Sequence, residues 1–244
     1  MKHNTICFAL AAALLLSIGV HHAEAQSQSP LIPTGELSAF PTFVQTGTHP
    51  TLTWSVTLPQ AVTDVVTITP PGELTPKQSM TMKVRVLGAS VKRVWLNSRG
   101  QITSWEWVPT EALLKYNSGS YTRIFYNTQD KVNPNTVVKT MTVAKNSSIN
   151  FAGRYYVDGT WSTMYNSASG QQVYALKDGD TPPTTTPLYQ QPTIESFLLP
   201  YLDDQGKIDL GPRDVIYLME LTHTNRNDDG YDLQDLALLV TFSE

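Results

Sequence analysis

The sequence is poor in the residues that most often carry chemistry. It has one cysteine, Cys7, and five histidines among 244 residues. Only His49 and His223 lie beyond residue 25, and neither lies in a zinc-binding or Ser-His-Asp pattern. No phosphate-binding or dinucleotide-binding glycine motif is present. These absences argue against a bound nucleotide cofactor and against a histidine-based catalytic centre, and we expect no catalytic residue of that kind.

The N-terminal segment is typical of a secretory signal peptide, residues 1–25. A short basic start precedes an almost uninterrupted apolar run from Phe8 to Val20, and Ala23-Glu24-Ala25 supplies small residues for cleavage. The apolar run is short for a bilayer span. We therefore expect secretion to the periplasm or the extracellular space, with no membrane span after cleavage; a retained N-terminal anchor is the alternative. The mature chain then has no cysteine, which excludes disulfides and thiolate chemistry.

Charge is distributed unevenly along the chain. Residues 26–200 carry 13 Lys and Arg against 10 Asp and Glu, whereas residues 201–244 carry 3 against 10. Nucleic-acid affinity comes from clustered basic side chains, which this chain lacks. The charge pattern therefore argues against nucleic acid as a partner, and the acidic C-terminal end suits cations better than phosphates.

Short β-type segments separated by Pro, Gly, Asn and Asp dominate the rest of the sequence. Residues 51–58 and 79–87 alternate apolar and polar side chains with period 2, which predicts strands with one wet face. Residues 214–221 and 236–242 are nearly continuous in apolar side chains, which predicts strands buried on both faces. We therefore predict an all-β fold, a single β-sandwich or jelly-roll-like domain with one or two short helices.

Two hairpins are predicted from turn residues. Residues 91–107 are predicted to form a hairpin with its turn at residues 97–100. Asp158-Gly159 lies between two alternating segments and predicts a two-residue type I′ turn. That turn pairs Tyr156 with Trp161 on one face of the hairpin.

The domain boundaries and helices follow from composition. We expect residues 26–33 to be a disordered lead-in and residues 34–244 to form one domain, crossed by a Pro/Thr-rich surface segment at residues 179–192. Residues 109–116 and 193–202 are predicted to form the short helices.

Aromatic side chains near the hairpins suggest a ligand surface. The candidates for stacking on sugar rings are Trp105, Trp107, Tyr155 and Trp161. Glu106, between two tryptophans, invites comparison with the carboxylates of polysaccharide-acting enzymes, but on a strand it points away from both. We expect a solvent-facing Glu106 behind buried tryptophans.

The C-terminal acidic loop is the candidate metal site. Asn225-x-Asn227-x-Asp229-Gly230 matches the first half of an EF-hand loop, but the twelfth position is Leu236 instead of glutamate. A looser calcium site remains open, with oxygen ligands from Asp228, Asp229, Asp232, Asp235 and Glu220. The alternative is a solvated turn in which Asp232 and Asp235 bond to the backbone.

Residues 214–242 also resemble the C-terminal end of certain uncharacterised secreted bacterial β-sandwich domains. In those domains a hydrophobic strand leads through a turn to D-[YF]-[NQ]-D and a last hydrophobic strand; the counterpart here is Asp232-Leu233-Gln234-Asp235, with Leu233 in place of an aromatic residue. The resemblance implies a β-rich extracellular protein and no catalytic residue. We therefore expect a secreted, non-enzymatic binding or structural module with an extracellular protein or glycan as partner. The alternative is a polysaccharide-binding module, or an enzyme that acts on polysaccharide through carboxylates.

Overall fold

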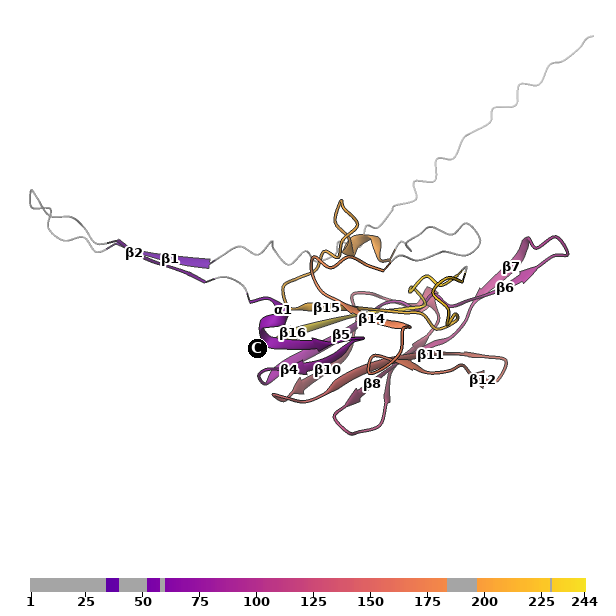
Figure 1. The fold of residues 1–244 in the computed structure, drawn as a ribbon, viewed down its shortest axis with the longest axis horizontal. Coiled ribbons are helices and arrows are strands. Elements are labelled where there is room, and N and C mark those ends of the chain that lie inside the picture. Colours follow the sequence, from indigo (N-terminus) through magenta and orange to yellow (C-terminus); the bar gives the residue numbers. More distant parts are fainter. Residues whose placement is uncertain (1–33, 40–51, 58–59, 184–196, 229) are drawn as a thin grey trace, which may run out of the picture.

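Two antiparallel sheets pack face to face and form most of the molecule (Figure 1). The structure is a computed structural model that describes residues 34–39, 52–57, 60–183, 197–228 and 230–244. The five-stranded sheet has the order β10 (Val137–Val143), β5 (Met80–Gly88), β16 (Leu236–Ser243), β15 (Asp214–Met219) and β14 (Val173–Leu176). The seven-stranded sheet contains β3 (Val66–Thr69), β4 (Glu73–Pro76), β11 (Ile149–Val157), β8 (Thr110–Tyr116) and β9 (Thr122–Asn127), with β12 (Thr160–Trp161) and β13 (Tyr165–Asn166) paired to β11. The predicted all-β sandwich is confirmed.

Helical structure is confined to short pieces in the described part of the chain. These are α1 (Val62–Val65) and the 3₁₀ turns η1 (Gln129–Lys131) and η2 (Leu199–Tyr201). No helix in the described ranges has the length and apolar character needed to cross a bilayer.

The predicted helix at residues 109–116 is wrong, because this segment is strand β8. β8 lies between β11 and β9, and pairing on both sides outweighs the helix propensity of its Glu, Ala, Leu and Lys residues. Of the predicted helix at residues 193–202, residues 193–196 lie outside the described residues, and the remainder contains only η2.

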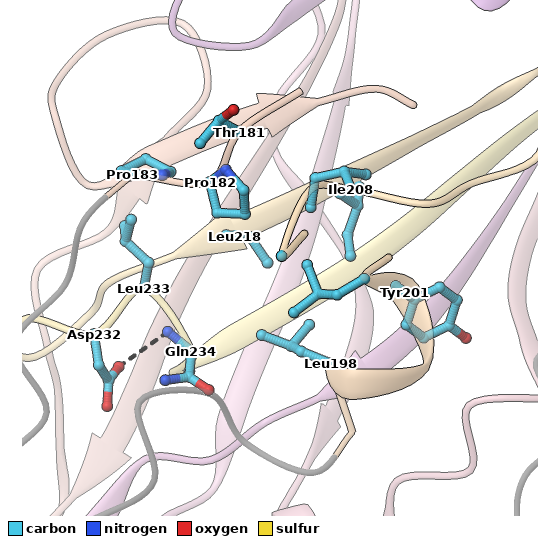
Figure 2. A pocket seen from close by; sticks show the side chains of 13 residues that line it. Thr181, Pro182, Pro183, Leu198, Tyr201, Ile208, Leu218, Asp232, Leu233 and Gln234 are labelled. Carbon is cyan, nitrogen blue, oxygen red and sulfur yellow. Dashed lines mark hydrogen bonds between the residues drawn. The ribbon is translucent and has the colours of Figure 1, made fainter. Parts of the chain in front are cut away.

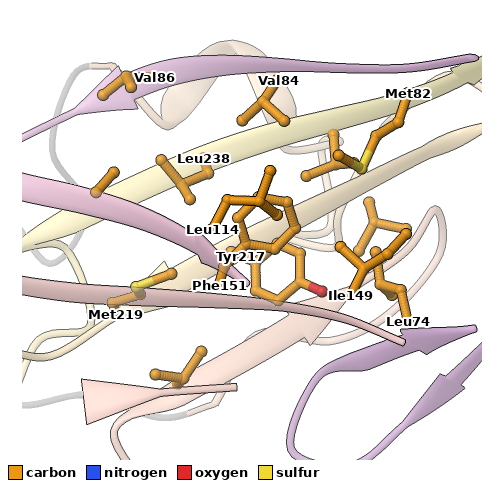
Figure 3. Close-up of a cluster of buried hydrophobic side chains, with 14 of the residues drawn as sticks. Leu74, Met82, Val84, Val86, Leu114, Ile149, Phe151, Tyr217, Met219 and Leu238 are labelled. Atoms are coloured by element: carbon orange, nitrogen blue, oxygen red, sulfur yellow. The ribbon is translucent and has the colours of Figure 1, made fainter. Parts of the chain in front are cut away.

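The inner faces of the two sheets enclose the larger apolar cluster (Figure 3). Alternate residues of β5 (Met80, Met82, Val84 and Val86) face this cluster, as the period-2 pattern predicts. Phe151 of β11 and Tyr217 of β15 meet at its centre, with ring centroids 4.9 Å apart. The core therefore joins the two sheets through large side chains.

β15 and β16 are buried on both faces, which explains their continuous apolar sequences. Their register pairs Met219 with Leu236 and Tyr217 with Leu238 on the core face. Ile216, Leu218 and Leu239 point to the opposite face and join a second apolar cluster outside the sheet. Residues from η2 and the neighbouring loops cover that second cluster.

Two hairpins stand outside the main sheets. β6 (Lys92–Leu96) and β7 (Ile102–Trp107) form the hairpin predicted at residues 91–107, and it projects beyond the sandwich in Figure 1. β1 (Thr34–Ala39) and β2 (Leu52–Thr57) form another two-stranded sheet, drawn apart from the main body. Trp54 of β2 is 75% exposed, so the apolar face expected to be buried there is not covered by described residues.

The hairpin between β11 and β12 confirms its predicted turn. Asp158 and Gly159 both have positive φ angles, 51° and 77°, as a type I′ turn requires. Tyr156 pairs with Trp161, and the Ser162 N–H donates to the Tyr155 carbonyl. The turn therefore sets which face of the hairpin each aromatic ring occupies.

One hydrogen bond links the two sheets through the core and can be tested by substitution. The buried Tyr217 hydroxyl donates to the Gly72 carbonyl across 2.5 Å. Tyr217→Phe leaves that carbonyl unpaired, and we expect a loss of about 1–3 kcal/mol in the free energy of unfolding. Tyr126→Phe, on the surface, is the control and should change stability by less than about 0.5 kcal/mol. Urea denaturation measures both, and equal stabilities of the two variants would contradict the assigned bond.

Candidate functional site

The acidic loop between β15 and β16 is built on two buried carboxyl groups. Because Met219 pairs with Leu236, the next residues outward, Glu220 and Asp235, face each other at the base of the loop. Glu220 is 0% exposed and Asp235 is 7% exposed. Burial of two carboxyl groups side by side is costly unless they are hydrogen-bonded and share their charge.

Glu220 accepts hydrogen bonds from both sides of the loop. Its Oε1 accepts the backbone N–H of His223 at 2.8 Å, as well as the N–H and hydroxyl of Thr222 at 3.0 and 2.7 Å. Its Oε2 accepts the N–H groups of Asp232 and Leu233 at 2.9 and 3.2 Å. One carboxylate thus fixes both ends of the loop backbone.

The pKa values of Asp235 and Glu220 are shifted in opposite directions. Burial, followed by the negative charge of Glu220, raises the pKa of Asp235 well above its ordinary value. Burial also opposes ionisation of Glu220, but hydrogen bonds from Asp235, Thr222 and the loop backbone outweigh it and lower the pKa of Glu220. Burial and the Glu220 charge thus favour the uncharged form of Asp235, whereas the loop hydrogen bonds favour the ionised form of Glu220.

The predicted calcium ligands occupy different environments. Glu220 and Asp235 lie together, but their oxygens accept N–H groups of the loop. Asp228 accepts a hydrogen bond from the side chain of Asn225, and Asp232 accepts one from the Gln234 N–H. No cluster of three acidic or histidine side chains suited to a metal is found among the described residues, which do not include Asp229.

Calcium binding by this loop stays a prediction. If the ion binds, a chelator should lower the melting temperature and millimolar calcium should restore it, because a ligand bound only to the native state stabilises that state. Asp228→Asn should then remove the calcium-dependent increase. An identical melting curve with chelator and with calcium would eliminate the site.

The loop also forms one wall of an apolar cavity on the outer face of the five-stranded sheet (Figure 2). The cavity has a volume of about 290 Å³. Leu233, 1% exposed, contributes to this wall with a φ angle of 61°, a left-handed conformation that is unusual for a bulky residue. The Glu220 hydrogen bond to its N–H supports that conformation.

A second candidate site lies on the outer face of the seven-stranded sheet. Glu111 of β8 is buried, and its two oxygens bond to the Nε atoms of Arg123 and Arg154, each at 2.5 Å. The guanidinium of Arg154 lies 4.1 Å from the ring centroid of Trp161, and that of Arg123 lies 4.6 Å from the ring of Tyr126. Neighbouring strands thus assemble an arginine–aromatic cluster.

Two further rings surround Trp161. Tyr126 and Tyr156 lie with their ring centroids 5.5 and 5.0 Å from it. We call Glu111, Arg123, Arg154, Tyr126, Tyr156 and Trp161 the arginine–aromatic surface. Tyr155, the other predicted ligand residue of this hairpin, points to the opposite face and packs against the core.

The tryptophans of the β6–β7 hairpin are at the surface. Trp105 is 52% exposed and lies 5.0 Å from Trp107 in an edge-to-face arrangement. The expectation of buried tryptophans is therefore wrong for Trp105, whereas Trp107 is half-buried. Glu106 faces solvent as expected and forms an ion pair with Arg93 at 3.7 Å. Arg93 also bonds to Asp158 in the β11–β12 turn, which connects this hairpin to the arginine–aromatic surface.

The charged residues of the arginine–aromatic surface were not found from the sequence. Glu111, Arg123 and Arg154 lie on three separate strands, and no local pattern connects them. The sequence does place Arg154 on the same face as Tyr156, because residues two apart on a strand point to the same side. To identify Glu111 as the partner of Arg154, the register between β8 and β11 must be known.

No protein-family model, curated protein or solved structure matches this chain. The candidate sites therefore rest on their own geometry.

The raised pKa of Asp235 predicts a particular dependence of stability on pH. Because its pKa is raised in the folded state, its contribution to stability is complete below the ordinary aspartate pKa and is lost as the pH rises. Asp235→Asn removes this titration. As the pH rises above the ordinary aspartate pKa of about 3.9, we expect the free energy of unfolding of the wild type to fall relative to the variant, by at most about 1.4 kcal/mol per pH unit.

Urea denaturation of both proteins at several pH values measures the difference. The lowered pKa of Glu220 acts in the opposite direction, but only as the pH falls below the ordinary glutamate range. It therefore does not obscure the effect of Asp235 at neutral pH. Parallel stability curves for the wild type and Asp235→Asn would contradict the raised pKa of Asp235.

Proposed function

We propose that this protein is an exported, non-enzymatic binding module that recognises an acidic polysaccharide through its arginine–aromatic surface. The observation that carries the proposal is the buried Glu111, which holds Arg123 and Arg154 in place beside the ring of Trp161. The signal-like residues 1–25 support export.

The arginines are organised before any ligand arrives. Ion pairs to Glu111 and stacking on aromatic rings restrict side chains that would otherwise lose conformational freedom on binding. Only the Nε of each guanidinium is bonded to a partner within the described ranges, so the terminal N–H donors of Arg123 and Arg154 can serve a ligand. A planar guanidinium suits a carboxylate, which it binds with two parallel hydrogen bonds.

The charge and the rings favour an acidic sugar polymer. Two arginines and one glutamate leave the surface with a formal charge of 2 − 1 = +1. Tyr126 and Trp161 add apolar ring surface, which suits the CH-rich faces of sugars. A single net charge is too small for nucleic-acid binding, which needs many phosphate contacts.

The named carboxyl groups have structural partners, which favours binding over catalysis. Glu111 is neutralised by two arginines, and Glu220 with Asp235 anchors the acidic loop. Glu106 is exposed and paired with Arg93. Glu220 and Asp235 lie side by side, but both are buried and accept loop N–H groups, which leaves them no access to a sugar substrate.

A protein partner is the second candidate, because the β6–β7 hairpin exposes apolar side chains. Trp105 lies opposite Val94, and Leu96 lies opposite Ile102. Trp95, Leu96, Ile102 and Trp105 are all exposed. Such a cluster on a projecting element is typical of a protein contact.

Binding to polygalacturonate tests the proposed function. In affinity electrophoresis of the mature chain, we expect retardation by polygalacturonate and none by a neutral glucan. Arg123→Ala and Trp161→Ala should each weaken binding about tenfold, as expected for side chains at the centre of a contact. Thermal unfolding of each variant checks that it is folded.

Two control variants make the test specific. Arg226→Ala removes an exposed arginine that stacks on Tyr174, away from Glu111, and should leave binding within about twofold of the wild type. Trp105→Ala removes the most exposed tryptophan ring of the β6–β7 hairpin. Binding that depends on Trp105 but not on Arg123 or Trp161 would assign the binding site to the β6–β7 hairpin and contradict the proposal. The absence of any binding would also contradict it.

A further inference from the structure

The cavity on the outer face of the five-stranded sheet has the properties of a small-molecule site. Its floor is formed by Ile216 and Leu218 of β15, which point away from the main core. Leu198, Ile208 and Leu233 enclose its sides (Figure 2). A mostly apolar space of about 290 Å³ is close to the lower end of the volumes of small-molecule sites.

The walls are held in place by backbone hydrogen bonds. The Ile208 N–H donates to the Asp180 carbonyl at 2.9 Å, and the Ile208 carbonyl accepts the Gly179 N–H at 2.8 Å. Leu202 forms a β-bridge with Ile208, and the Tyr201 N–H donates to the Leu198 carbonyl at 2.9 Å. These bonds oppose collapse of the walls, so the cavity is preformed as ligand sites usually are.

One end of the cavity is polar. Asp232 and Gln234 flank Leu233 and lie together at that end, where the Gln234 N–H donates to the Asp232 carboxyl group at 3.0 Å (Figure 2). The Glu220 carboxylate, which accepts the N–H groups of Asp232 and Leu233, fixes this edge. The left-handed φ of Leu233 is therefore maintained where its side chain meets the cavity, and such conformations concentrate at functional sites.

We propose that this cavity binds a small apolar molecule that ends in a hydrogen-bond donor, such as an alkyl amine or alcohol. The apolar walls take the hydrocarbon part, and the Asp232 end takes the donor. Residues 201–244, which supply most of the walls, carry 3 Lys and Arg against 10 Asp and Glu. That charge favours a cationic or neutral end and disfavours a carboxylate, so we expect fatty acids to bind more weakly than amines.

This site is separate from the proposed polysaccharide surface. The cavity lies outside the five-stranded sheet, and Glu111 with its arginines lies outside the seven-stranded sheet. The main core separates the two. The inference therefore does not depend on the proposed function.

Calorimetric titration with alkylamines from butylamine to octylamine tests the site. Each added methylene should increase affinity about fourfold until the cavity is full, because burial of one CH₂ contributes about 0.8 kcal/mol. Octanoate should bind at least about tenfold more weakly than octylamine. No binding of any amine, or equal binding of octanoate, would overturn the proposal.

Matched tryptophan variants locate the binding. Ile208→Trp fills the cavity and should weaken octylamine binding about tenfold or more. Leu199→Trp lies on the exposed side of η2 and should leave affinity within about twofold. Ile208→Trp could also reduce binding by impairing folding, so Gln234→Glu provides a second variant. It adds a negative charge at the polar end of the cavity and should increase the preference for octylamine over octanoate. An unchanged preference, or equal effects of the two tryptophans, would contradict the assignment.

Discussion

The pairing of β15 with β16 is the constraint on which the rest of the structure depends. The two strands form adjacent members of the five-stranded sheet and are buried on both faces. Their inner side chains complete the main core with β11 and β8, and their outer side chains form the floor of the second cluster. Their register also places Glu220 opposite Asp235. The acidic loop, the cavity wall and the core are therefore set by one pair of strands.

Glu220 shows how a buried charge can organise a surface. A carboxylate with no exposed area is stable here because the hydrogen bonds described above satisfy it and because the raised pKa of its neighbour Asp235 disfavours a second negative charge. The same hydrogen bonds shape residues 232–234, which form a wall of the cavity. Glu111 has a similar role on the opposite sheet, where it fixes two arginines. In both places a buried acid orients groups that face outward.

Much of the fold was predictable from the sequence because its signals are local. Period 2 in residues 79–87, continuous apolar character in residues 236–242 and the Asp158-Gly159 turn each describe one strand or hairpin, and all three are confirmed. Residues 109–116 were mistaken for a helix because pairing with two distant strands determines their conformation. The arginine–aromatic surface depends on the same distant pairings, so its charged members could not be identified. The acidic loop was located correctly, but the role of Glu220 depends on burial that the sequence does not show.

The central claim is that the β15–β16 core separates two binding faces that act independently. Hydrogen–deuterium exchange of the mature chain, measured with octylamine and with polygalacturonate in turn, tests this claim most directly. The amine should slow exchange at residues 198–210 and 231–235, and the polysaccharide should slow exchange at residues 122–127 and 154–162. The amides of β15 and β16 should be the slowest to exchange in every sample, because they lie at the centre of the core. Protection of the same residues by both ligands, or fast exchange in β15 and β16, would contradict the account.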